Sequence, residues 1–218
     1  MSLCMTVNRF ENEIIAHEQR AIQTGKILLY GSSFFTNWGY ERAQEQWAEA
    51  SSGGLQVVNH GFGGSTVDEL LYYYSRMVKP YSPSMVVLRT GFNDVMMGLS
   101  PEQVWFLTER LLAWLRTDFP DAQIVLLENF DSRLPNDTQM EQIRSYNLHL
   151  RNFAEQTDRV YSLEMNHFVY ERESDIGIRE KLRNVFVSDG IHLTDEAYTE
   201  VAQYIVQRIV ALCQLETK

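Results

Sequence analysis

The chain has 218 residues, a length that suits one domain, and its 44% hydrophobic and 22% charged residues exclude a collagen-like, coiled-coil or disordered chain. Its formal net charge of −10 would repel phosphate backbones and anionic lipid surfaces, so nucleic acid is not an expected partner. No apolar run approaches the roughly 18 residues that span a bilayer, so stable membrane insertion is not expected either.

The cysteines and the N-terminal segment bear on location. Cys4 and Cys213 are too few for a disulfide framework and fit a reducing compartment. Charged residues interrupt the N-terminal segment, which therefore has no apolar stretch of signal-peptide type. We expect a cytoplasmic protein with a single domain over residues 1–218, in which residues 1–24 form an N-terminal helical extension. The sequence leaves homo-oligomerisation open.

Five short apolar runs are predicted to be strands. Each is nearly continuous in apolar residues, as expected for parallel strands that are covered on both faces. They are Lys26 to Tyr30, Leu55 to Asn59, Met85 to Arg89, Gln123 to Leu127, and Arg159 to Leu163.

Helical patterns lie between these strands. The clearest begins at Ser100, where a serine N-cap, Pro101 and Gln103 form a capping box with proline at the first helical position. The predicted helices cover residues 67–77, 101–115, 139–155 and 195–212. Strands that alternate with helices predict right-handed βαβ units, a parallel sheet and a three-layer α/β/α sandwich. In such sheets ligands bind outside the carboxyl ends of the strands.

Chemically useful residues follow three of the predicted strands and precede the last helix. The segments are "GSS" at 31–33, "NHGFGGS" at 59–65, "GFND" at 91–94 and "VSDGIHLT" at 187–194. Together they supply a hydroxyl, backbone donors, an amide and an acid–imidazole pair, which are the parts that acyl transfer needs. A Gly-x-Ser-x-Gly elbow is absent because Phe35 occupies its second glycine position, which disfavours an ordinary α/β-hydrolase.

These four segments resemble the SGNH hydrolases, the GDSL-like esterase and lipase superfamily. The family's serine matches Ser33, its glycine Gly64, its asparagine Asn93, and its Asp-x-x-His pair Asp189 and His192. The resemblance implies a flavodoxin-like fold with a five-stranded parallel sheet of order 2-1-3-4-5, and neither a metal nor an organic cofactor. Two positions depart from the family pattern, because Ser32 and Ser65 stand where acidic residues are usual.

The resemblance assigns roles, each of which has a structural alternative. Ser33 is the expected nucleophile, although a serine after a strand can simply cap the next helix. His192 is the expected general base and Asp189 its orienting carboxylate. An isolated histidine is more often a hydrogen-bonded core residue, and an isolated aspartate before glycine also suits a turn or a helix cap. The N–H groups of Ser33 and Gly64 and the side chain of Asn93 are expected to form an oxyanion hole, although Gly64 and Asn93 also suit a turn.

The histidines and cysteines lack metal-ligand spacing, so no metal is predicted. Arg89 ends an otherwise apolar predicted strand, and one interpretation is that it pairs with a carboxylate beneath the site.

The aromatic residues near these motifs suggest the substrate. An apolar substrate pocket or simple core packing would both account for Phe34, Phe35, Phe62, Phe92 and Met96. We expect a serine esterase for a small ester with an acetyl to medium-chain acyl group. Alternatives with the same machinery are a carbohydrate O-acetyl esterase, a lysophospholipase, a thioesterase or an acyltransferase. An alternative of another class is a non-catalytic flavodoxin-like binding protein.

Overall fold

The computed structural model describes residues 8–171 and 181–216. Cys4 lies outside these residues, and the side chain of Cys213 is not described. Within the described part of the chain, no helix is long and apolar enough to cross a membrane.

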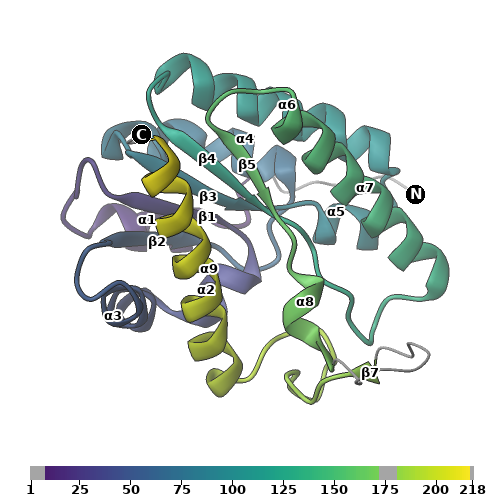
Figure 1. Ribbon diagram of the computed structural model, residues 1–218. Coiled ribbons are helices and arrows are strands. Elements are labelled where there is room, and N and C mark those ends of the chain that lie inside the picture. Colours follow the sequence, from purple (N-terminus) through teal and green to yellow (C-terminus); the bar gives the residue numbers. More distant parts are fainter. Residues whose placement is uncertain (1–7, 172–180, 217–218) are drawn as a thin grey trace.

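A five-stranded parallel sheet forms the middle layer, with the strand order β2-β1-β3-β4-β5 (Figure 1). Every residue of the first four strands is buried, which explains why their sequences are almost continuously apolar. The strands are β1 (Ile27–Gly31), β2 (Val57–Gly61), β3 (Met85–Arg89), β4 (Gln123–Leu127) and β5 (Val160–Leu163). The predicted α/β class, parallel sheet and strand order are confirmed.

Helices cover both faces of this sheet. They are α1 (Glu11–Glu18), α2 (Ser33–Trp38), α3 (Tyr40–Ala50), α4 (Val67–Met77), α5 (Phe92–Met96), α6 (Pro101–Asp118), α7 (Asp137–Glu155), α8 (Asn166–Val169) and α9 (Asp195–Glu216), with a 3-10 turn η1 at Lys79–Tyr81. One core lies between the sheet and α1, α4, α6 and α7, and the other between the sheet and α2, α3 and α9 (Figure 1). A two-stranded antiparallel hairpin, β6 (Tyr170–Glu171) with β7 (Lys181–Leu182), follows α8.

The capping box predicted for α6 is present. The Ser100 N–H donates to Gln103 Oε1 at 2.9 Å, and the Gln103 N–H donates to Ser100 Oγ at 3.3 Å. Both bonds satisfy backbone donors that the first turn of a helix leaves free. This local signal therefore located the start of the helix correctly.

Helix α2 packs very closely against the end of β2. A Cβ atom on Gly61 would lie 2.5 Å from Phe35 Cβ and 2.6 Å from the Thr36 nitrogen, so only glycine permits this approach. The Asn59 side chain adds a tie by donating to the carbonyl oxygen of Phe35 at 2.8 Å and that of Gly39 at 2.9 Å. The contact fixes the start of α2 at the carboxyl edge of the sheet.

Candidate active site

Ser33 is the first residue of α2 and is separated from the end of β1 only by Ser32. Its Oγ lies 2.9 Å from Nε2 of His192, a residue 159 positions away in the chain. Ser32 occupies the N-cap position, but its side chain makes no capping hydrogen bond, and only its carbonyl accepts from the turn that follows. The two serines thus have different surroundings, and Ser33 is the one that meets an imidazole.

The turn before α9 brings Asp189 and His192 together. The His192 Nδ1–H donates to Asp189 Oδ2 at 2.6 Å, while Oδ1 accepts from the backbone N–H groups of Ile191 and His192 at 2.9 and 3.0 Å. These bonds lower the pKa of Asp189 to about 2, and the bond from the His192 imidazole has the largest effect. An ionised Asp189 keeps the proton on Nδ1, which leaves Nε2 free to accept from Ser33.

The loop after β2 borders the nucleophile. A Cβ atom on Gly63 would lie 3.8 Å from Ser33 Cβ. The next residue, Gly64, has a φ of 82°, a left-handed conformation that favours glycine, and its Cβ position faces open space. The loop after β2 thus lies next to Ser33, and no other atom of the described residues occupies the space around the Gly64 Cβ position.

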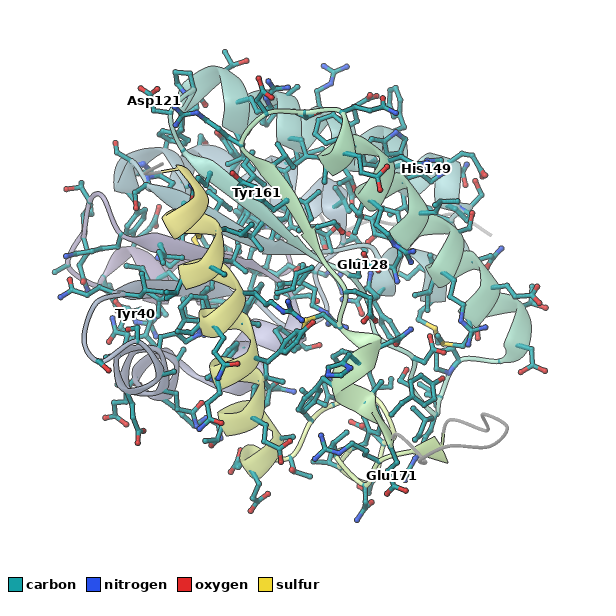
Figure 2. The ribbon with its side chains drawn as sticks, in the orientation of Figure 1. Tyr40, Asp121, Glu128, His149, Tyr161 and Glu171 are labelled. Atoms are coloured by element: carbon teal, nitrogen blue, oxygen red, sulfur yellow. The ribbon has the colours of Figure 1, made fainter. Side chains whose placement is uncertain are left out.

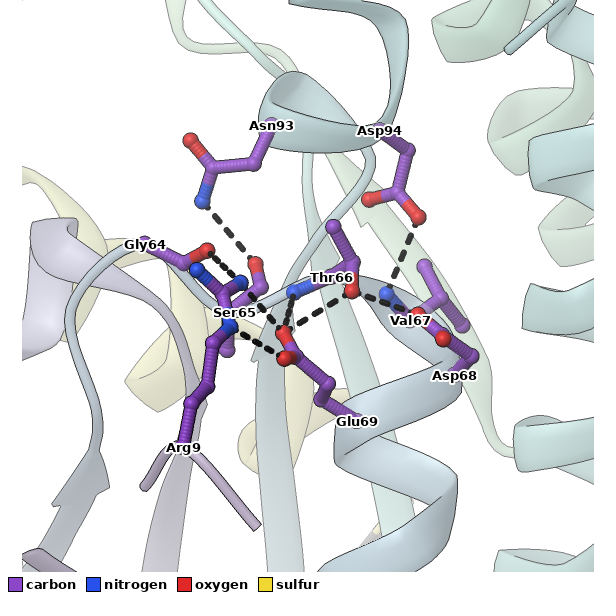
Figure 3. A network of polar contacts seen from close by, with 9 residues as sticks. All are labelled: Arg9, Gly64, Ser65, Thr66, Val67, Asp68, Glu69, Asn93 and Asp94. Carbon is purple, nitrogen blue, oxygen red and sulfur yellow. Dashed lines mark hydrogen bonds and ion pairs between the residues drawn. The ribbon is translucent and has the colours of Figure 1, made fainter. Parts of the chain in front are cut away.

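Asn93 joins the loop after β3 to the loop after β2. Its Nδ2 donates to the carbonyl oxygen of Ser65 at 2.9 Å (Figure 3). A side-chain amide carries two N–H donors, so this bond uses only one of them. The structure thus places Asn93 next to the Gly64 loop, as the sequence predicted for neighbouring strand ends.

An N-terminal arginine holds the Gly64 loop from outside. Arg9 Nη2 donates to the Gly64 carbonyl at 2.9 Å and to Glu69 Oε2 at 2.7 Å, and Arg9 Nε also bonds Glu69 (Figure 3). Glu69 in turn accepts from the Thr66 N–H at 3.0 Å at the start of α4. The Thr-x-x-Glu pattern was a readable capping signal for Glu69, whereas no local pattern points to Arg9, 55 residues before Gly64.

A buried acid of α5 is hydrogen-bonded to the start of α4. Asp94 is 0% exposed, and its Oδ1 accepts from the Val67 N–H at 3.0 Å (Figure 3). Burial raises the pKa of Asp94 to about 7, while the backbone bond opposes that rise. Glu69 and Asp94 are thus two acidic groups near the segment 64–67. They lie at other positions than the acids usual in the family, where this chain has Ser32 and Ser65.

A narrow cavity of about 10 Å³ opens beside Ser33 and His192. Ser33 and His192 line it together with Phe34, Phe92, Phe130 and Arg89. This volume is close to the smallest that holds one water molecule. A much larger hollow of about 750 Å³ runs along β5, where Glu128 and Tyr161 lie, but it contains none of the catalytic candidates (Figure 2).

The aromatic residues considered for the pocket are divided between the cavity and the core. Phe34 and Phe92 line the cavity. Phe35 and Phe62 are 0% exposed and belong to the two cores, and Met96 packs against the core on the α4 side. Core packing, the structural alternative, therefore describes these last three residues.

Arg89 also differs from its sequence interpretation. Among the described residues, no carboxylate forms an ion pair with it, so the suggested pairing beneath the site is wrong. Its guanidinium lies between two phenylalanine rings instead, with Cζ 4.6 Å from the Phe34 centroid and 4.5 Å from that of Phe130.

The arrangement contains a hydroxyl, a base and an orienting carboxylate in hydrogen-bonded sequence. This geometry can remove a proton from the hydroxyl as it attacks a carbonyl carbon and return that proton to a leaving group. In the described part of the chain, no cluster of three or more His, Cys, Asp or Glu side chains could hold a metal ion.

Several solved structures share this fold at low sequence identity. A structure from Streptococcus pneumoniae described as a putative platelet activating factor has a TM-score of 0.71 at 16% identity, over 93% of this chain and 91% of that one. A GDSL-like lipase from Bacteroides thetaiotaomicron has a TM-score of 0.69 at 17% identity, over 95% and 98%. A catalytic mutant of an acetylxylan esterase from Geobacillus stearothermophilus has a TM-score of 0.65 at 18% identity, over 87% and 96%.

The sequence comparisons give a more specific result. No curated protein matches the chain. Residues 29–199 match the model of the GDSL-like lipase/acylhydrolase family, a segment that includes Ser33, Gly64, Asn93, Asp189 and His192. With most of its length matched and its fold shared by esterases and lipases of this kind, the chain belongs to the GDSL-like lipase/acylhydrolase family of ester-hydrolysing enzymes.

Proposed function

We propose that the protein is a serine esterase that hydrolyses small carboxylic esters through an acyl-enzyme on Ser33. The observation that carries this proposal is the chain of hydrogen bonds from Asp189 to His192 to Ser33, with lengths of 2.6 and 2.9 Å. A hydroxyl bonded to an imidazole that is itself held by a carboxylate is the arrangement of an activated nucleophile.

The proposed reaction has two halves. Ser33 Oγ attacks the ester carbonyl carbon while His192 Nε2 takes its proton, and the intermediate collapses as His192 gives that proton to the leaving alkoxide. Water then attacks the acyl-enzyme with His192 again as base, releasing the acid and restoring Ser33. The N–H groups of Ser33 and Gly64 and the Asn93 side chain are proposed to bind the developing oxyanion.

The cavity favours the short end of the expected substrate range. About 10 Å³ of space beside Ser33 and His192 suits an acetyl-sized group better than a medium-length chain. The acetylxylan esterase among the structural neighbours makes a carbohydrate O-acetyl ester one candidate substrate. Lysophospholipids and thioesters with long acyl chains are less well matched to this space.

A labelling experiment tests the nucleophile. The folded protein is treated with a fluorophosphonate, and the adduct is located by peptide mass spectrometry, with Ser33→Ala as the control. We expect one adduct on Ser33 in the wild type and none in the variant. An unlabelled Ser33 in folded protein would favour the non-catalytic binding protein instead.

A substrate panel tests the size preference. Aryl esters with acyl chains from acetyl to hexadecanoyl are compared by kcat/KM under identical conditions. We expect acetyl esters to be the best substrates, with a steep decline as the chain lengthens. A flat profile or a preference for long chains would reject the small-ester assignment.

A further inference from the structure

Arg89 is a cation buried inside the catalytic end of the sheet. It is the last residue of β3, and only 8% of it is exposed. Its guanidinium is held between the rings of Phe34 and Phe130 at 4.6 and 4.5 Å. Stacking on two aromatic faces recovers part of the cost of removing a cation from water.

In the part of the chain that the structure describes, no acidic side chain neutralises this cation. Within residues 8–171 and 181–216, neither a hydrogen bond nor an ion pair joins Arg89 to another side chain, and its Nε is fully covered without a partner. Burial lowers the pKa of Arg89 to about 10, so the group keeps its charge at neutral pH. The chain has 29 acidic residues against 19 basic ones, yet none of the described acids pairs with Arg89. A buried charge is normally paired, so Arg89 lacks the partner that its position requires.

The missing partner would have to enter from the catalytic cavity. Arg89 lines the same cavity as Ser33 and His192. Another polar group at this cavity, the Tyr198 hydroxyl, already donates to the Phe34 carbonyl at 2.8 Å. With Nε covered, the terminal N–H groups of Arg89 are the donors left for a ligand. The space of about 10 Å³ admits only a small group there.

We propose that Arg89 binds a small anionic group of the ester substrate, a carboxylate, next to Ser33. The inference rests on the proposed esterase function and narrows its substrate to esters that carry a negative charge close to the scissile bond. Guanidinium and carboxylate groups form charge-assisted hydrogen bonds, and these strengthen where water is excluded. The carboxylate can belong to the acyl half or to the alcohol half of the ester, and the two cases are separable by experiment.

Matched substrates test the proposal without any mutation. Ethyl hydrogen succinate carries the charge on the acyl side and is compared with neutral ethyl isocaproate. Acetoxyacetate carries it on the alcohol side and is compared with neutral isobutyl acetate. We expect kcat/KM of the wild type to favour the anionic member of one pair by about tenfold or more, and that pair identifies the side. Equal rates within both pairs would overturn the proposal.

Substitution then tests whether Arg89 is the cause. The measured quantity is the ratio of kcat/KM for the anionic ester to that for its neutral partner. Arg89→Met should bring this ratio down by about tenfold or more, and Arg89→Lys should retain part of it. Arg208→Met is the control, because Arg208 also stacks on an aromatic ring, that of Tyr204, but lines the hollow along β5. A purely structural Arg89 would lower both rates and leave the ratio unchanged, which would overturn the proposal.

Direct binding separates this inference from the esterase proposal. Calorimetry with the Ser33→Ala protein and the two carboxylate esters, in chloride-free buffer, detects binding without turnover. We expect the preferred carboxylate ester to give a measurable heat of binding with Ser33→Ala. The double variant that also carries Arg89→Met should give none. If the protein hydrolyses neutral esters but neither prefers nor binds carboxylate esters, the inference about Arg89 is rejected and the esterase proposal stands. Carboxylate binding without labelling of Ser33 or hydrolysis would reject the esterase and keep the anion site.

Discussion

Arg9 Nη2 donates to the carbonyl oxygen of Gly64 at 2.9 Å, so a residue from the N-terminal segment restrains the loop beside Ser33. The Gly64 carbonyl lies in one peptide plane with the Ser65 N–H, so this bond fixes the orientation of the peptide that directly follows Gly64. We predict that Arg9→Met lowers kcat for an acetyl ester by about tenfold with little change in KM, because misplaced donors weaken binding of the transition state. Arg9→Lys should recover part of the loss.

Arg76 supplies the control for this prediction. It forms ion pairs with Glu11 and Glu18 of α1, and so it attaches the same N-terminal region to α4 without touching Gly64. Arg76→Met should therefore reduce stability slightly and leave kcat near the wild-type value. Equal losses of kcat in both variants would show that Arg9 acts only by docking the N-terminal segment.

The two adjacent serines should respond differently to substitution. Ser33→Ala removes the group that would attack the ester, and we predict a loss of kcat on the order of 10⁴-fold or more. Ser32→Ala removes a side chain that makes no capping bond, while the carbonyl that accepts from Phe35 and Thr36 stays in place. Its kcat should fall by less than about tenfold. Steady-state kinetics with an aryl acetate checks both, and the reverse order would identify Ser32 as the nucleophile.

Asp189 should matter through its charge and its acceptor oxygens. Asp189→Asn keeps the shape, but it replaces an oxygen that accepts the His192 Nδ1–H at 2.6 Å with a group that can donate. The imidazole then favours the wrong tautomer, and we predict a loss of kcat on the order of 10³- to 10⁴-fold. Circular dichroism of the variant should remain that of the wild type. A loss below about tenfold would mean that Asp189 does not orient His192.

Asp94 should make stability depend on pH between about 4 and 7. Its pKa is raised from 3.8 to about 7, so in this range the folded state keeps a proton that the unfolded state releases. Its contribution to stability is therefore full below pH 3.8 and is lost as the pH rises to about 7, by up to about 4 kcal/mol. We predict that Asp94→Asn gains stability relative to the wild type over this interval in urea unfolding. A difference independent of pH would contradict this assignment.

His17 and His60 should give the opposite dependence. Burial lowers the pKa of His60 to about 3 and that of His17 to about 4, while an unfolded histidine titrates near 6.5. Their contribution is present above pH 6.5 and is lost as the pH falls, because the unfolded chain binds protons that the folded state refuses. We predict that His60→Asn has a shallower loss of unfolding free energy between pH 6.5 and 4 than the wild type. The same slope in both proteins would show that His60 is not buried as a neutral group.

The parts of the fold that local patterns specify were predictable. Strands Met85–Arg89 and Gln123–Leu127 and helix α4 have the predicted bounds, since each is a periodic or continuous apolar segment between turn residues. Helix α3 was missed because it is mostly polar: only Ala43 and Trp47 of its eleven residues are buried. The hairpin β6–β7 was missed because strands of two residues carry no detectable pattern.

The site was predictable to the extent that its residues fall in short motifs. Asp189 and His192 are three positions apart, and Ser33 follows a strand, so their types and places were readable. The sequence could not predict that Arg9 contacts Gly64 or that Arg89 is unpaired, because each feature depends on which distant side chains the fold brings near. Burial by tertiary packing likewise decided that Phe35 and Phe62 belong to the cores rather than to the cavity.

The 2.9 Å bond between Ser33 and His192 connects the start of α2, just after the first strand in the chain, to the turn before the last helix, α9. Residue 33 leaves the ribosome long before residue 192, so a nascent chain can complete most of the sheet while its serine remains an ordinary, unreactive alcohol. On the proposed mechanism, Ser33 gains its base only when the turn that carries Asp189 and His192 is in place. Reactivity of Ser33 toward an electrophile should then report the completion of folding at the opposite end of the chain.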